Sequence, residues 1–188
     1  MQHDSGSFGA STTNLAEFVR QSAARSGDRP ALLFRDETIT WRELDASVDA
    51  IARGLATLGH APGDRVAVAL GNTPDFVRTY FGILRAGLVA VPVNPGYRAR
   101  ELAHVLADSA ARTLIATGDV VQEANRIREE LPALEHQYAP GGADHGTSDL
   151  GELAVPLGEP AAPGSRGDDL AVLLYTSGSE GNPKGAML

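Results

Sequence analysis

Near the end of the chain, hydroxyl side chains, glycines and a lysine follow the apolar run 170–175. Thr176, Ser177 and Ser179 can donate hydrogen bonds, and Lys184 carries a mobile positive charge. Glycines let the backbone take positive φ angles and approach a ligand closely. Such groups commonly surround a bound phosphate. The sequence therefore predicts a buried strand, covered on both faces, and then a phosphate-binding loop that is neither strand nor helix. The glycines of this loop are Gly178, Gly181 and Gly185.

The spacing of these residues separates the known kinds of phosphate-binding loop. A Walker A loop has a glycine directly before its lysine and a Ser or Thr after it, whereas Pro183 precedes Lys184 and Gly185 follows it. The dinucleotide fingerprint G-x-G-x-x-G fails as well, because Gly178 and Gly181 are three residues apart. The remaining alternatives are another kind of phosphate loop and a glycine-rich surface loop after an edge strand.

The composition argues against several other functions. A formal net charge of -8, with no dense Lys/Arg face, argues against nucleic acid or an anionic membrane as the main partner. The chain has no Cys, and its five His are scattered, so neither a disulfide nor a metal site is expected. The longest nearly apolar run, 86–93, is too short to span a bilayer, and residues 1–11 do not resemble a signal peptide. We expect a cytoplasmic protein.

Apolar residues recur at helix or strand spacing along most of the chain. The clearest helix covers 41–58, with Thr40 as its cap, Glu43 completing a capping box, and Trp41 packed in the core. Strands that alternate with helices predict an α/β fold with a mostly parallel sheet covered by helices. The other predicted helices are 14–26, 74–87, 100–108 and 119–131, and the predicted strands are 30–34, 37–40, 65–70, 88–91, 113–116 and 134–138.

The domain organisation follows from composition. Residues 1–13 are polar and predicted to be flexible, and 14–188 are predicted to form one unit. Within this unit, the stretch 140–167 contains 11 Gly or Pro in 28 residues, so neither a long helix nor a central strand is expected there. We expect a surface connection there, with one turn at 148–153.

The run Thr-Ser-Gly-Ser-Glu-Gly-Asn-Pro-Lys-Gly at 176–185 closely resembles the signature loop of the adenylate-forming superfamily, [ST]-S-G-[ST]-T-G-x-P-K-G. Glu180, in place of Thr, is the one departure. Other stretches resemble the same family in the same order, so that the resemblance covers nearly all of 15–188. These stretches are 39–44, 63–67, 81–87 and 91–95, with Glu101-Leu102 downstream.

The resemblance implies the N-terminal part of the large domain of an adenylate-forming enzyme, incomplete in these 188 residues. Family members activate a carboxylic acid with ATP and Mg²⁺ and pass the acyl group to coenzyme A or a carrier protein. The family's acyl pocket and catalytic lysine lie downstream, so no catalytic residue or metal ligand is expected here, and the chain alone should be inactive. The resemblance implies that the ATP phosphates are bound by Thr176, Ser177, Gly178, Ser179, Glu180, Gly181 and Lys184.

Three kinds of protein remain open. The run 91–95 slightly favours an acyl-CoA synthetase over a peptide-synthetase adenylation domain. The third kind is a short, non-catalytic nucleotide-binding or protein-interaction module. A reading frame that continues past Leu188 into the later family motifs would favour the ligase, and a stop codon there would favour the module.

Overall fold

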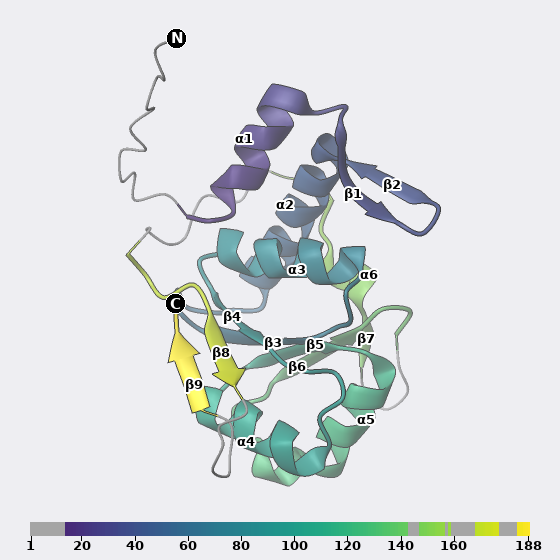
Figure 1. Ribbon diagram of the computed structural model, residues 1–188. Coiled ribbons are helices and arrows are strands. Elements are labelled where there is room, and N and C mark those ends of the chain that lie inside the picture. Colours follow the sequence, from purple (N-terminus) through teal and green to yellow (C-terminus); the bar gives the residue numbers. More distant parts are fainter. Residues whose placement is uncertain (1–13, 143–146, 157, 159–167, 177–183) are drawn as a thin grey trace.

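A parallel five-stranded sheet forms the centre of the computed structural model, which describes residues 14–142, 147–156, 158, 168–176 and 184–188 (Figure 1). The strand order is β4-β3-β5-β6-β7. β3 lies inside the sheet, pairing in parallel with β4 through Val66↔Ala90 and with β5 through Val66↔Thr113. The α/β class with a parallel sheet is confirmed. The strands are β3 (Arg65–Ala69), β4 (Val89–Pro92), β5 (Thr113–Ala116), β6 (His136–Ala139) and β7 (Ser148–Asp149).

Helices cover both faces of this sheet (Figure 1). Side chains alternate along a strand, so Val66 and Val68 of β3 pack with α2 and α3, while Ala67 and Ala69 pack with α4 and α5. Both sets are fully buried, as expected for strands that are apolar without alternation. The helices are α1 (Glu17–Ser26), α2 (Trp41–Thr57), α3 (Pro74–Arg85), α4 (Ala99–Ser109), α5 (Gly118–Arg126) and α6 (Leu150–Leu153).

Local signals near the N-terminus are read correctly from the sequence. β1 (Pro30–Phe34) and β2 (Glu37–Thr40) form the expected antiparallel hairpin. The capping box of α2 is present: the Thr40 N–H donates to Glu43 Oε2 at 2.8 Å, and the Glu43 N–H donates to Thr40 Oγ1 at 3.3 Å. Trp41 is partly buried and packs against the small core between α1, α2 and the hairpin. Two helices are clearly shorter than predicted: α1 begins at Glu17 and not at 14, and α5 ends at Arg126, where the short helix η1 (Arg128–Glu130) follows it. Ile127 and Leu131, on either side of η1, are both buried in the core.

A buried arginine joins the first three helices. Arg85 of α3 is fully buried, and its guanidinium pairs with Asp45 at 2.7 Å and with Asp49 at 2.8 Å, both on α2. It also donates to the carbonyl oxygen of Ala16, just before α1, at 3.1 Å. The charge is therefore paired and hydrogen-bonded where water is excluded, which is the condition for burying an arginine.

The C-terminal hairpin departs from the prediction. We expected 170–175 to be a strand covered on both faces, but β8 runs over Leu173–Thr176 and only Tyr175 is buried in it. β8 pairs antiparallel with β9 (Lys184–Met187) and touches the main sheet through one parallel bridge, Ala90↔Val172. Lys184 and Gly185 are thus in a strand, where a loop was expected. The apolar run was misread because one face of β8 lies against α4 and the main core, while Leu174 on the other face is 37% exposed.

The stretch 140–167 is more structured than predicted where it is described. β7 extends the sheet beyond β6, and α6 packs on the α2 side, so this part of the chain contributes to the core through Leu150 and Leu153. The segment 1–13, predicted to be flexible, lies outside the described residues, as do 143–146, 157 and 159–167.

Candidate functional site

The two ends of the predicted phosphate-binding loop lie directly opposite each other. Thr176, the last residue of β8, pairs with Lys184, the first residue of β9, and both are exposed. Opposite residues of an antiparallel pair place their side chains on the same face, so the hydroxyl and the ammonium group share one face of the hairpin. The other predicted phosphate ligands, Ser177, Gly178, Ser179, Glu180 and Gly181, lie outside the described residues.

The opposite face of the hairpin is attached to α4 through Tyr175. This side chain is 7% exposed, and its hydroxyl donates to Asp108 Oδ2 at 2.5 Å. Its ring meets the ring of His104 edge to face, with 6.3 Å between the centroids. Burial, and then the hydrogen bond to Asp108, raise the pKa of Tyr175 above its ordinary value, so the phenol remains a donor at neutral pH.

Gly185 has a packing role in this hairpin. It lies opposite Tyr175 in the strand register. A Cβ atom on Gly185 would lie 3.0 Å from Leu173 Cδ1 and 3.3 Å from Tyr175 Cζ. A side chain at this position would therefore push against the tyrosine ring. Close packing against Tyr175, and not a positive φ angle, therefore explains why this position of the motif is a glycine.

Sequence reasoning missed the residues that anchor the hairpin. Asp108 lies 67 positions before Tyr175, and no periodicity links them. The one available signal was a carboxylate in the last turn of a predicted helix, where the helix dipole opposes a negative charge. Sequence reasoning also passed over a feature of composition, namely that Lys184 is the only lysine of the chain and every other strong cation is an arginine.

Two of the family-like stretches serve the fold. In 63–67, Asp64 accepts from the Ala61 N–H at 3.0 Å and pairs with Arg112 at 2.5 Å, which ties the start of β3 to the start of β5. In 91–95, Asn94 follows β4, and its Oδ1 accepts from the Gly96 N–H at 2.9 Å. These contacts close turns next to the sheet.

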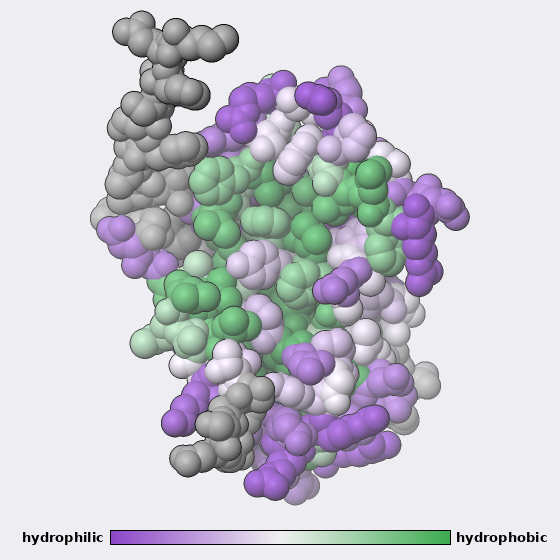
Figure 2. Space-filling model, in the orientation of Figure 1, coloured by the Kyte–Doolittle hydropathy of each residue, from purple (hydrophilic) through white to green (hydrophobic). Residues whose placement is uncertain are grey.

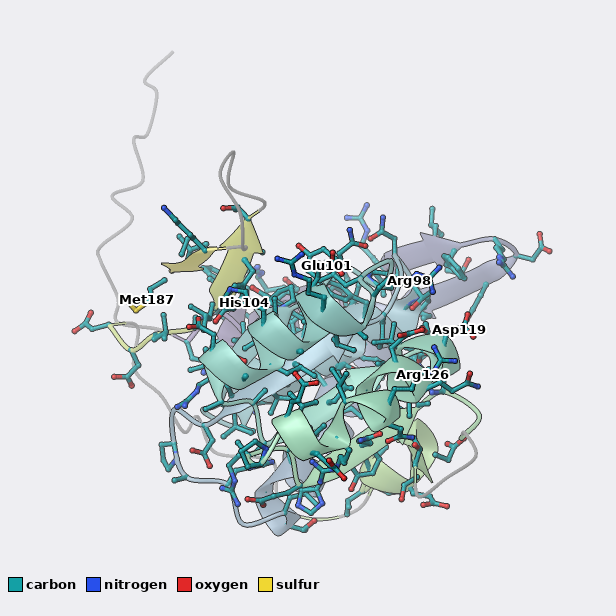
Figure 3. The ribbon with its side chains drawn as sticks, turned by 90° about the horizontal axis from the view of Figure 1, so that it is seen from below. Arg98, Glu101, His104, Asp119, Arg126 and Met187 are labelled. Atoms are coloured by element: carbon teal, nitrogen blue, oxygen red, sulfur yellow. The ribbon has the colours of Figure 1, made fainter. Side chains whose placement is uncertain are left out.

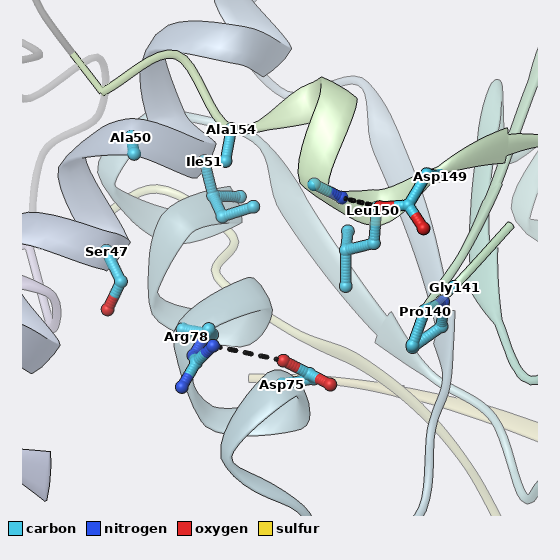
Figure 4. Close-up of a pocket in the computed structure, with 11 residues that line it drawn as sticks. Ser47, Ala50, Ile51, Asp75, Arg78, Pro140, Gly141, Asp149, Leu150 and Ala154 are labelled. Carbon is cyan, nitrogen blue, oxygen red and sulfur yellow. Dashed lines mark hydrogen bonds and ion pairs between the residues drawn. The ribbon is translucent and has the colours of Figure 1, made fainter.

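A cavity of about 270 Å³ opens between α2, α3 and α6 (Figure 4). None of the described candidate phosphate ligands lines it. Its charged groups already have partners: Arg78 pairs with Asp75 at 3.3 Å, and Asp149 accepts from the Gly151 N–H at 2.6 Å. The cavity is thus separate from the candidate site. In the part of the chain that is described, no three His, Asp or Glu side chains are grouped to hold a metal ion, and no helix is long and apolar enough to cross a membrane.

Apolar side chains are exposed on the face that carries α1, α3 and the hairpin (Figure 2). Phe18 on α1 is 53% exposed, and Met187 and Leu188 at the end of the hairpin are 75% and 70% exposed. Leu15, just before α1, and Leu174 on β8 are also exposed.

The fold defines an α/β protein whose parallel sheet is followed by the β8–β9 hairpin, with Thr176 and Lys184 paired at the two ends of the hydroxyl-rich sequence 176–184. Residues 19–188 match the family described as AMP-binding enzyme. The chain therefore belongs to the AMP-binding enzyme family of adenylate-forming synthetases and ligases.

Its relatives include both peptide synthetases and acyl-CoA ligases. It is 31% identical to tyrocidine synthase 3 of Brevibacillus parabrevis over 94% of this chain and 2% of the relative. It is also 31% identical to the long-chain-fatty-acid–CoA ligase of Escherichia coli O157:H7, over 93% of this chain and 36% of the relative. The solved structure of the anthranilate CoA ligase AuaEII with anthranoyl-AMP matches with a TM-score of 0.86 at 26% identity, over 94% of this chain and 34% of that one. The chain thus spans little more than a third, or less, of these proteins.

Proposed function

We propose that this chain is the N-terminal part of an ATP-dependent acid–thiol ligase of the acyl-CoA synthetase type. In the first step a carboxylate oxygen attacks the α-phosphorus of ATP, giving an acyl-adenylate and releasing pyrophosphate. In the second step a thiol, that of coenzyme A, attacks the acyl carbonyl and AMP leaves. The observation that carries the proposal is the pairing of Thr176 with Lys184 at the two ends of a loop sequence that matches the family signature in all positions but one.

The residues of this chain act on the phosphates. The loop from Thr176 to Lys184 supplies hydroxyl and backbone donors for the β- and γ-phosphates. The ammonium group of Lys184 attracts the negative charge that moves onto the pyrophosphate as the bond to the α-phosphate breaks. Because that charge is larger in the transition state than in bound ATP, the interaction lowers the barrier more than it tightens binding. Mg²⁺ bound to the triphosphate would add to the same charge neutralisation.

The test is ATP–pyrophosphate exchange by the complete gene product across a panel of carboxylic acids. We expect exchange that depends on one class of acid, and Lys184→Ala should lower kcat/KM for ATP by at least about tenfold, the usual cost of losing one charged contact in the transition state. The KM for the acid should stay nearly unchanged. A wild-type protein that exchanges no pyrophosphate with any acid would leave the non-catalytic module as the better account, and an unimpaired Lys184→Ala variant would remove the lysine from the mechanism.

The peptide-synthetase type is the second candidate, favoured by the 31% identity to tyrocidine synthase 3. Both types form an adenylate, so exchange does not separate them. Mass spectrometry of the product after the second step does: a coenzyme A thioester supports the synthetase, and an acylated carrier protein supports the peptide-synthetase type.

A further inference from the structure

The β8–β9 hairpin is attached to the rest of the domain by few contacts. Among the residues of its two strands, which are all described, Tyr175 is the one that is buried, and the whole of β9 is exposed. The backbone adds one hydrogen bond to β4, from the Ala90 N–H to the carbonyl oxygen of Ala171 at 3.0 Å. Leu173 is partly buried against the same core as Tyr175, so Tyr175 is the buried member of the two side chains that set the direction in which β8 leads into the loop sequence.

Tyr175 is fixed by one face of α4. His104 and Asp108 are four residues apart on this helix and so lie on the same side of it, where one meets the tyrosine ring and the other accepts from its hydroxyl. Figure 3 shows α4 with His104 next to the hairpin. Asp108 lies in the last turn of α4, where the helix dipole disfavours a carboxylate, so the helix itself gains nothing from it. Its stabilising contact is the hydrogen bond from Tyr175.

The tyrosine hydroxyl points away from the predicted ligand. Because side chains alternate along β8, Tyr175 points to the core side, while Thr176 and its partner Lys184 are on the exposed side. The hydroxyl is used on Asp108 and can affect a bound phosphate only through the strand.

We propose that Asp108, by holding the hydroxyl of Tyr175, is a positioning residue that fixes the hairpin in the orientation needed to bind the phosphates of ATP. The inference rests on the proposed function. When the contact is absent, the hairpin is displaced for part of the time. The apparent affinity for ATP is then the intrinsic affinity multiplied by the fraction of molecules in which the hairpin is in place. A hydrogen bond to an ionised acceptor, lost at a partly buried site, corresponds to a change of up to about tenfold.

The main experiment measures ATP–pyrophosphate exchange in the complete gene product. Tyr175→Phe keeps the ring and removes the hydroxyl, and it should raise the KM for ATP up to about tenfold while leaving the KM for the acid unchanged. Asp108→Asn keeps an acceptor oxygen without its charge, and since neutral hydrogen bonds are about half as strong, a change of about threefold is expected. The double variant should be no worse than Tyr175→Phe alone, because both changes act on one contact.

A second measurement follows Lys184 directly. It is the only lysine of these 188 residues, so its labelling by an amine reagent is readily located by mass spectrometry. ATP should protect it, and the ATP concentration for half protection should rise in Tyr175→Phe by the same factor as the KM. Tyr138→Phe is the matched control, since Tyr138 is 9% exposed and lies on β6, within the main sheet. It should change neither value.

Each outcome decides between the two proposals. If the wild-type protein neither exchanges pyrophosphate nor shows protection of Lys184, the proposed function fails and this inference fails with it. If the wild type behaves as expected and Lys184→Ala is impaired, but Tyr175→Phe and Asp108→Asn match the wild type, this inference alone is wrong. It is also wrong if Tyr138→Phe raises the KM equally, or if the effects of the two variants simply add.

Discussion

Replacing Arg85 by methionine is expected to destabilise the fold through charge. Methionine keeps much of the aliphatic volume, so the cavity left behind is small. The change leaves the carboxylates of Asp45 and Asp49 next to an apolar side chain after two contacts of 2.7 and 2.8 Å are lost. Breaking a buried pair in this way costs about 3–5 kcal/mol.

The exposure of the two aspartates places the expected loss for Arg85→Met at the lower end of this range. The side chains of Asp45 and Asp49 are 21% and 14% exposed, so water can partly replace the guanidinium. Asp49 also keeps Arg20 at 3.3 Å. We therefore expect a loss of about 3 kcal/mol in the free energy of unfolding. For a domain of this size that loss lowers Tm by about 6–12 °C.

Urea unfolding, followed by the fluorescence of Trp41, the single tryptophan, measures this loss. The control is Arg42→Met, which breaks a pair with Asp28 of similar length, 2.9 Å, but with side chains 68% and 91% exposed. It should cost less than about 1 kcal/mol. The triple variant that adds Asp45→Asn and Asp49→Asn should recover at least half of the loss, because no unpaired charge remains. Equal losses in the Arg85 and Arg42 variants, or no recovery in the triple variant, would refute the reasoning.

Three further predictions concern pH, the exposed face and the loop. Burial, and then the charge of Arg112, lower the pKa of His60 from 6.5 in the folded protein. The unfolded chain therefore binds more protons, and stability should fall as the pH drops from 7 through 6.5 to the lower pKa of the folded protein. His60→Asn should flatten that part of a Tm–pH curve, and an unchanged slope would contradict this prediction. The 188-residue chain should bind a hydrophobic dye and scatter light, since Met187 is 75% exposed and β9 presents an edge strand; a monodisperse monomer without dye binding would argue against this. In the complete gene product, Glu180→Thr should lower the KM for ATP modestly and leave kcat little changed, because it removes a repulsion. A carboxylate about 4 Å from a phosphate charge is repelled by about 1 kcal/mol in water and by about 4 kcal/mol at a dielectric constant of 20. A large increase in the Mg²⁺ concentration needed for half-maximal rate would instead mean that Glu180 acts through the metal.

The parts of the fold that the sequence predicts well are those set by neighbours in the chain. The capping box of Thr40 and Glu43 needs only three residues of separation, and it is present as expected. The strands β3 and β5 were recognised because apolar residues run without alternation through them. The run 170–175 has the same appearance, yet burial of a strand depends on which elements lie over it, and that is a property of distant residues. The prediction for this run was therefore half right: Tyr175 faces the core and Leu174 does not.

Polar contacts between residues far apart in the chain could not be predicted from the sequence for the same reason. Arg85 and its two aspartates are about 40 residues apart, and an arginine on a helix is normally expected at the surface. Nothing in the spacing marks it as the residue that joins three helices. Asp108 and Tyr175 present the same problem at greater distance, and the phosphate-binding role of Ser177 to Gly181 remains a prediction of the motif alone.

The arginines Arg85 and Arg112 and the lysine Lys184 lie in different surroundings, and their contacts explain the choice of side chain. Arg85 and Arg112 each hold two carboxylates at once, for which a planar guanidinium with five donors is suited. Lys184 is on an exposed strand at the end of the predicted loop. Under the proposed function, its compact charge on a flexible stem would follow a phosphate whose charge and position change during the reaction. The rigid contacts lie within the fold, and the adaptable one lies at the end of a hairpin that Tyr175 and Asp108 attach to α4. If the two proposals hold, Tyr175 and Asp108 would set the orientation of β8 before ATP binds, and only the side chain of Lys184 on β9 would have to adjust.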